Sequence, residues 1–133
     1  MIWKEILDWN DNTLKDIRFV GFAYIKEGHY ETALKIFEGL LVLSEDNPYD
    51  LKTLGALHLQ VGNPLLALQY LDKSLKKDPS DLQVQLNRTK ALLTLGYRKQ
   101  GLSEARRLSY SSDETIAKNA SALLLAFPAQ KLI

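Results

Sequence analysis

Apolar residues return at intervals of three and four along most of this chain, which is the spacing of one face of an α-helix. The first long stripe runs from Leu14 to Glu27. Its apolar and small members are Leu14, Ile17, Val20, Gly21, Tyr24 and Ile25. A second stripe predicts a helix over Tyr30 to Leu43, and Gly28 and His29 between the two predict a turn. The pattern therefore predicts a helical hairpin.

A shorter stripe precedes this hairpin. Its apolar residues are Ile2, Trp3, Ile6 and Leu7, and they predict a brief N-terminal helix. The run Asp11-Asn12-Thr13 then predicts a break and a helix cap.

The hairpin pattern repeats at a fixed distance of 34 residues. The turn glycines Gly28, Gly62 and Gly96 have this spacing. Other pairs at the same spacing are Gly21 and Gly55, Tyr24 and His58, Ala33 and Ala67, and Phe37 and Leu71. A period of 34 residues is that of the tetratricopeptide repeat, a helix-turn-helix unit. The sequence predicts repeats at about 14–47, 48–81 and 82–111, followed by a capping helix over 112–127.

The expected fold is therefore all-α. Three hairpins stack as a short right-handed solenoid, with the N-terminal helix before them and the capping helix after them. The 133 residues form a single domain, and a composition of 46% hydrophobic and 25% charged residues is that of a globular protein.

The third repeat departs from the pattern. The turn glycine and the small residue of the next helix are five residues apart in the first two repeats, from Gly28 to Ala33 and from Gly62 to Ala67. In the third repeat the distance from Gly96 to Ala105 is nine residues. Four extra residues are about one helical turn. Either the first helix runs on to a turn at Gly101, which we favour, or the loop is longer.

The first helix of each repeat lines the concave face of a tetratricopeptide stack. We assign its second, fifth, ninth and twelfth positions to that face, counting from Leu14, Pro48 and Leu82. The resulting candidate peptide-binding residues are Lys15, Arg18, Phe22, Ile25, Tyr49, Lys52, Ala56, Leu59, Gln83, Leu86, Lys90 and Leu93. Six of them are apolar, so we expect an apolar stripe that binds a polypeptide. The alternative is that other helices of the chain cover the stripe.

Little in the sequence indicates chemistry. There are no cysteines and two histidines, and His58 occupies the packing position of Tyr24, so we expect neither a metal site nor a catalytic centre. No glycine loop for a phosphate and no cofactor motif is present. The net charge of +1 and the short apolar runs predict no nucleic-acid or membrane partner. A small basic patch is predicted from Arg98, Lys99, Arg106 and Arg107, most simply as a solvated surface.

Three stretches resemble a narrower family. They are Tyr30 to Leu43 with its start Tyr-Glu-Thr-Ala-Leu-Lys-Ile-Phe, Leu54-Gly55-Ala56 with Gln60 and Gly62, and Ala91-Leu92-Leu93 with Gly96 and Glu104-Ala105. In this order they resemble the class II chaperones of bacterial type III secretion. The resemblance implies a cytoplasmic bacterial protein that holds a translocator subunit before export, with an extended client segment in apolar pockets of the concave face.

The same resemblance implies partners other than the client. An N-terminal helix often mediates dimers in that family, so a homodimer or a co-chaperone contact is expected through Ile2, Trp3, Ile6 and Leu7. Two alternatives stay open: a needle-subunit chaperone of the same system, and a tetratricopeptide scaffold subunit of a larger assembly. Co-chaperones that grip a terminal carboxylate are a poorer match, because Arg18 fits their pattern but Phe22 and Thr53 do not.

Overall fold

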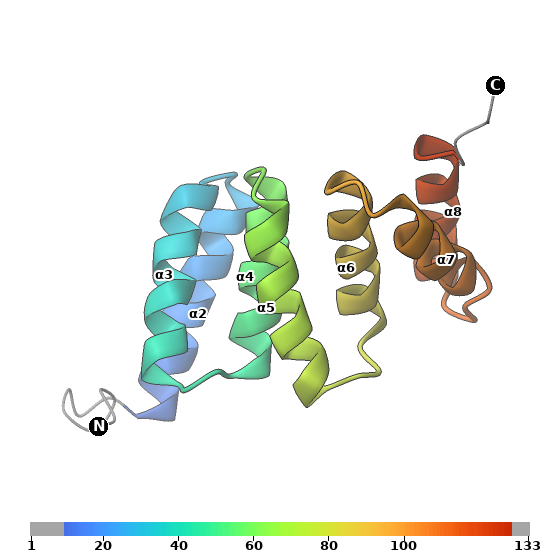
Figure 1. Cartoon of the computed structure of the whole chain (residues 1–133). Helices are drawn as coiled ribbons and strands as arrows, with labels where there is room; N and C mark the ends of the chain where they lie inside the picture. Colours follow the sequence, from blue (N-terminus) through green and yellow to red (C-terminus); the bar gives the residue numbers. More distant parts are fainter. Residues whose placement is uncertain (1–9, 129–133) are drawn as a thin grey trace.

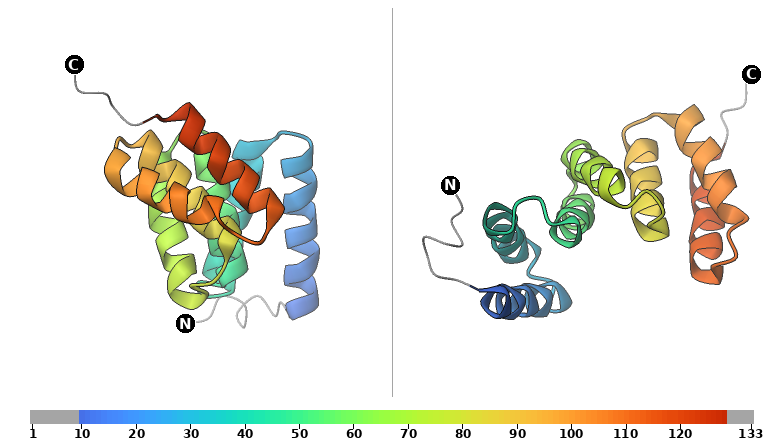
Figure 2. Two further views of the ribbon diagram at one scale, coloured as in Figure 1. Left: turned by 90° about the vertical axis from the view of Figure 1, so that its right-hand side faces the viewer. Right: turned by 90° about the horizontal axis from the view of Figure 1, so that it is seen from below.

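The computed structural model describes residues 10–128, which form seven α-helices and contain no strand. The helices are α2 (Asp11–Lys26), α3 (Tyr30–Leu43), α4 (Pro48–Gln60), α5 (Pro64–Lys77), α6 (Leu82–Thr94), α7 (Arg98–Ser109) and α8 (Glu114–Ala126). The three hairpins and α8 follow one another in a row (Figure 1), and the row bends in the view from below (Figure 2, right). The expected all-α fold of stacked helical hairpins is confirmed. The N-terminal helix predicted within residues 2–9 lies outside the described residues.

The first helix of each hairpin, and α8, begins at an asparagine or aspartate whose side chain accepts backbone N–H groups of the first turn. These capping residues are Asn10, Asn47, Asp81 and Asp113. The first helix starts earlier than predicted, because Asn10 caps it and Asp11 is already helical. A cap of this kind contributes about 1 kcal/mol and fixes where the helix begins.

Each hairpin turn contains a glycine in the left-handed region, with φ of +81° at Gly28, +87° at Gly62 and +93° at Gly96. The residue after each glycine donates its N–H back into the last turn of the first helix, as in the 2.9 Å bond from His29 to the Tyr24 carbonyl. Only glycine adopts this conformation without strain, so each glycine ends its helix and lets the return helix start directly.

The irregularity predicted in the third repeat does not exist. Gly101 lies inside α7, five residues after Gly96, and is buried at the position of Ala33 and Ala67. A Cβ atom there would lie 2.6 Å from Cδ2 of Leu93, so an alanine would require the Leu93 side chain to shift. Ala105 instead occupies the position of Phe37. The 34-residue period therefore continues without an insertion, and both the longer helix and the longer loop are wrong.

The apolar core continues along the row in three clusters. The largest joins α2, α3 and α4 around Phe37 and Leu54, and the next joins α5 to α6 around Leu71. The last places Ile116 and Ala120 of α8 against Leu86 and Leu108. One face of α8 thus covers the end of the third hairpin, whereas Leu125 on another face is 84% exposed. Within residues 10–128, no helix combines the length and apolarity that crossing a bilayer requires.

Candidate peptide-binding groove

A hollow of about 440 Å³ lies across the first helices of the three hairpins. We call it the aromatic hollow, because Phe22, Tyr30 and Tyr49 are among its lining side chains. The remaining lining residues are Ile25, Lys52, Thr53, Ala56, Leu57, Gln60, Gln83, Val84 and Asn87. They come from α2, α4 and α6, with Tyr30 from the start of α3.

Ring contacts fix the orientation of Phe22 in this hollow. Its ring meets the buried ring of Phe37 edge-on, with 5.2 Å between the ring centres, and meets Tyr49 edge-on at 5.7 Å. Tyr49 is exposed, and the ammonium group of Lys52 lies 5.1 Å from its ring centre. Phe22 therefore presents a fixed apolar edge to the hollow while it is anchored in the core.

A second hollow, of about 400 Å³, adjoins the first and is called the α8 hollow. Its lining residues are Ala56, Leu59, Gln60, Asn87, Lys90, Thr94, Leu123 and Phe127. Ala56, Gln60 and Asn87 line both hollows, so the two adjoin, and we call them together the groove. The groove runs from α2 across α4 and α6 to the C-terminal half of α8.

The structure brings together eight of the twelve residues that the sequence assigned to this face. They are Phe22, Ile25, Tyr49, Lys52, Ala56, Leu59, Gln83 and Lys90. Their lining of the groove is a geometric finding, and their role in binding a polypeptide stays a prediction.

Arg18 does not belong to the groove. Its Nε and Nη2 atoms donate to the two carboxylate oxygens of Asp50, both at 2.8 Å, and Nη2 also donates to Ser44 Oγ at 3.2 Å. Asp50 is fully buried, and these hydrogen bonds raise the pKa of Arg18 above its ordinary value. The guanidinium group thus joins α2 to α4 and is not free to hold a client or a terminal carboxylate.

The fifth position of the later repeats faces the next hairpin in the same way. Lys52 Nζ lies 3.2 Å from Asp81 Oδ2 at the start of α6, although its side chain also reaches the aromatic hollow. Leu86 is 0% exposed and packs in the core between α6, α7 and α8. The assignment of Leu86 to an open face is therefore wrong.

Two more of the assigned residues lie outside both hollows. Leu93 is only 5% exposed because its side chain fills the space above Gly101 of α7. Lys15 is exposed on α2 but lines neither hollow. Leu86 and Leu93 are therefore buried where an uncovered stripe was expected, and Lys15 is exposed outside both hollows.

The groove includes a helical stripe that differs in part from the predicted one. On α4 four of the lining residues, Tyr49, Thr53, Ala56 and Gln60, occupy the second, sixth, ninth and thirteenth positions, and Lys52, Leu57 and Leu59 line the groove beside them. On α6 the same positions are Gln83, Asn87, Lys90 and Thr94. Their spacing of three and four residues is a regular helical face, so the periodicity could have identified it. The lining residues that the sequence missed are Tyr30, Thr53, Leu57, Gln60, Val84, Asn87, Thr94, Leu123 and Phe127.

His58 is a packing residue in the structure. It is buried and stacks on the ring of Tyr70 at 5.5 Å between ring centres, and neither ring nitrogen has a hydrogen-bond partner within residues 10–128. Burial lowers the pKa of His58, outweighing the carboxylates of Glu38 and Glu31. Among residues 10–128, no group of three metal-binding side chains converges.

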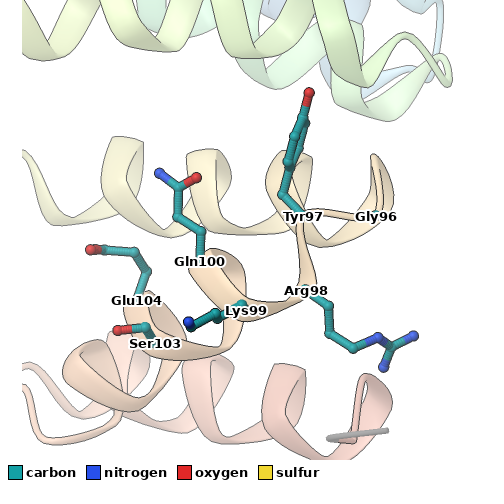
Figure 3. Close-up of a pocket in the computed structure, with 7 residues that line it drawn as sticks. All are labelled: Gly96, Tyr97, Arg98, Lys99, Gln100, Ser103 and Glu104. Carbon is teal, nitrogen blue, oxygen red and sulfur yellow. The ribbon is translucent and has the colours of Figure 1, made fainter.

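A further hollow, of about 630 Å³, lies at the turn between α6 and α7 and includes Tyr97, Lys99 and Glu104 (Figure 3). Its other lining residues are Gly96, Arg98, Gln100 and Ser103, so Tyr97 is its one large aromatic side chain among the described residues. Arg98 points away from Lys99 in this view, and its Nη1 donates to the Pro128 carbonyl oxygen at 2.6 Å. Arg107 pairs with Glu104 at 2.6 Å. The basic residues of the predicted patch are thus partly engaged, and the described lining of this hollow includes no leucine, isoleucine or phenylalanine, unlike that of the groove.

Solved structures with this fold include translocator chaperones. PcrH from Pseudomonas aeruginosa is 26% identical with a TM-score of 0.76, over 90% of this chain and 95% of PcrH. The Yersinia enterocolitica chaperone SycD, in complex with a peptide of the translocator YopD, is 23% identical with a TM-score of 0.77, over 89% and 94%. The first tetratricopeptide domain of Spaghetti (RPAP3), bound to an HSP90 peptide, is 16% identical with a TM-score of 0.73, over 87% and 96%. The expected resemblance to tetratricopeptide proteins and to translocator chaperones is confirmed.

Sequence comparison adds less. No protein-family model matches the chain. The CTR9 homolog of Arabidopsis thaliana is 38% identical over 64 residues, which are 48% of this chain and 6% of that protein. A match to so small a part of a repeat protein agrees with the helical-repeat fold and carries no argument about activity.

Proposed function

We propose that this chain is a non-catalytic chaperone that holds a segment of a type III secretion translocator subunit in the groove, in the cytoplasm of a bacterium. The observation that carries the proposal is the groove of two adjoining hollows, with Phe22 and Tyr49 in one and Leu123 and Phe127 in the other. The likeness to PcrH and SycD supports it, because SycD has been solved with a translocator peptide.

The lining suggests how the groove holds a client. Apolar side chains of the client are removed from water against Phe22 and Leu59, at roughly 25 cal/mol per Å² of buried apolar surface. Ala56, which lines both hollows, has a short side chain and lets a client backbone approach α4. The side-chain amides of Gln60 and Asn87 beside it carry donors and acceptors that suit an extended backbone. Covering apolar client segments in this way keeps them from aggregating before export.

Co-expression with the hydrophobic translocator subunits of the host's own secretion system tests the proposal. We expect the wild-type chain to keep its client soluble and to elute with it in size-exclusion chromatography. The variant Ala56→Arg places a long cation where the two hollows meet and should abolish the complex. Ala56 is exposed and arginine is a good helix former, so folding should be unaffected.

The matched control is Ala122→Arg, an equal change at an exposed position of α8 that lines neither hollow. It should retain the client. A complex that survives Ala56→Arg, with circular dichroism unchanged, would reject the groove as the client site. A complex that forms with the needle subunit and not with a translocator would support the needle-subunit chaperone instead.

A finer proposal concerns a second copy or a co-chaperone. Val20 is exposed on α2, whereas its counterpart Leu54 is buried against the preceding hairpin. This face of α2 therefore suits a helix contributed by another chain. The residues expected to supply the contact, Ile2, Trp3, Ile6 and Leu7, lie outside the described residues. Light scattering of Val20→Asp should show a smaller particle than the wild-type chain if the face is an interface.

A further inference from the structure

The two ends of the groove differ in charge. The described residues that line the two hollows include no aspartate or glutamate, and include the two lysines Lys52 and Lys90. Lys52 is already paired with Asp81 at 3.2 Å. Among residues 10–128, Lys90 has no carboxylate within 4.0 Å, so the α8 hollow contains a cation without a counter-charge.

The surroundings of Lys90 strengthen any ion pair it forms. The lysine is half-buried on α6, and the α8 hollow sets it beside the apolar side chains of Leu59, Leu123 and Phe127. Apolar walls reduce the solvent around a charge, so an ion pair formed here is screened less than one on an open surface. An apolar client residue next to this cation would leave the ammonium group partly desolvated and unpaired, which is unfavourable.

The equivalent position of the other hairpins has no charge. In the 34-residue period, Lys90 of α6 corresponds to Ala56 of α4 and to Phe22 of α2. The lining of the groove therefore changes along its length. It is aromatic at Phe22, has a small side chain between two amides at Ala56, and is cationic at Lys90. A groove with unlike ends favours one direction of the bound chain, because reversing the client would set its apolar anchor against Lys90.

We propose that the α8 hollow is a specificity subsite that binds an acidic side chain of the client through Lys90, beside an apolar residue that packs on Leu123 and Phe127. This inference rests on the proposed function of the groove. The occupant is a polypeptide segment with an apolar anchor for the aromatic hollow and an aspartate or glutamate farther along. Lys90 sets the register and direction of that segment, and the apolar contacts supply most of the affinity.

Selection from a displayed library of short random peptides tests the proposal without knowledge of the natural client. The full chain and its Lys90→Glu variant are immobilised and used separately. We expect the wild-type chain to enrich peptides with an acidic residue at a fixed distance from an apolar anchor. Lys90→Glu should enrich lysine or arginine at that same position. In fluorescence anisotropy, the best acidic peptide should bind Lys90→Glu roughly tenfold more weakly and Lys90→Gln about threefold more weakly.

Lys35→Glu is the matched control, since it makes the same charge change at an exposed site of α3 that lines neither hollow. It should select the same peptides as the wild-type chain. Enriched peptides that fail to bind Ala56→Arg but bind Lys90→Glu unchanged would overturn the acidic subsite and leave the groove in place. If the wild-type chain enriches no peptide, or peptides that bind Ala56→Arg equally well, the proposed function fails and the subsite fails with it.

Discussion

At one core crossing, the first two hairpins have a glycine on the first helix and a large side chain on the second. The third hairpin has the larger residue on its first helix and the smaller one on its second. In the first hairpin Gly21 faces Phe37, and in the second Gly55 faces Leu71, with a hypothetical glycine Cβ within 2.7 Å and 2.5 Å of the larger side chain. The third hairpin has Thr89 and Ala105 at these two positions, and both are buried. The hairpins thus share one backbone because the combined volume at the crossing is kept, whichever helix supplies it.

The contacts between hairpins differ as well. The junction of α2 with α4 contains the buried ion pair of Arg18 and Asp50, whereas Leu86 makes an apolar contact at the corresponding place between α6 and α8. An ion pair and a leucine can serve the same geometry, but they fail differently when one partner is removed.

The largest expected effect comes from breaking the ion pair on one side. Arg18→Met leaves the carboxylate of Asp50 buried without its cation, and should lower the free energy of unfolding by about 3–5 kcal/mol. Urea denaturation followed by circular dichroism measures the change. Lys52→Met is the control, because Lys52 is more exposed and its pair with Asp81 should contribute about 1 kcal/mol or less. Equal losses in the two variants would contradict the contrast between the junctions.

Replacing Gly55 and Leu71 of the second hairpin by the residue types of Thr89 and Ala105 tests whether the two helices share the volume at the crossing. Leu71→Ala should cost about 2–5 kcal/mol by leaving a cavity. Gly55→Thr should cost about 1–3 kcal/mol by overpacking against Leu71. The double variant restores the combination found at Thr89 and Ala105, so its loss should be smaller than the sum by about 1 kcal/mol or more. Strictly additive losses in denaturation experiments would show that the two sites do not share their space.

A smaller effect is expected at His58, whose counterpart in the third hairpin is Leu92. Both ring nitrogens of His58 are buried without partners, which costs about 1–3 kcal/mol for each unsatisfied group. His58→Leu should therefore raise the free energy of unfolding at neutral pH. Leu92→His is the reciprocal variant and should lower it. A destabilised His58→Leu variant would show that the stacking contact with Tyr70 matters more than the unpaired nitrogens.

The pH dependence of stability follows from the same residue. Burial lowers the pKa of His58, so the unfolded chain binds a proton more readily than the folded one. Above the ordinary histidine pKa of about 6.5, both states are neutral at this residue and no effect arises. As the pH falls below that value, the wild-type chain should lose stability until the folded pKa is passed. Denaturation at several pH values should show a weaker loss for His58→Leu.

The sequence predicted the hairpins because their signals are local. Gly28, Gly62 and Gly96 end helices through backbone conformation alone, and apolar periodicity marks the core face. The third hairpin misled the prediction because Ala105 was matched to Ala33 by residue type, whereas its position corresponds to Phe37. When a larger residue on one helix is balanced by a smaller residue on the other, matching single residues by type does not reveal it.

The candidate groove was predicted in part for a related reason. Counting positions from the start of each helix found Phe22, Tyr49 and Ala56, but the fifth position turned out to face the next hairpin, as Arg18 and Leu86 show. Leu123 and Phe127 were missed because their place depends on how α8 packs against α6 and α7, a long-range contact that helical periodicity does not contain.

The smallest expected effect on folding is at Phe19, which corresponds in the 34-residue period to Thr53 and Asn87. Thr53 and Asn87 line the groove, and Phe19 continues their stripe on α2 with 77% of its surface exposed. Phe19→Gln should change the free energy of unfolding by no more than about 0.5 kcal/mol. It should weaken client binding about fivefold if Phe19 extends the aromatic end of the groove. Leu65→Gln, an exposed apolar residue of α5 that lines neither hollow of the groove, should leave client binding unchanged. Equal binding by both variants in fluorescence anisotropy would place the end of the groove at Phe22.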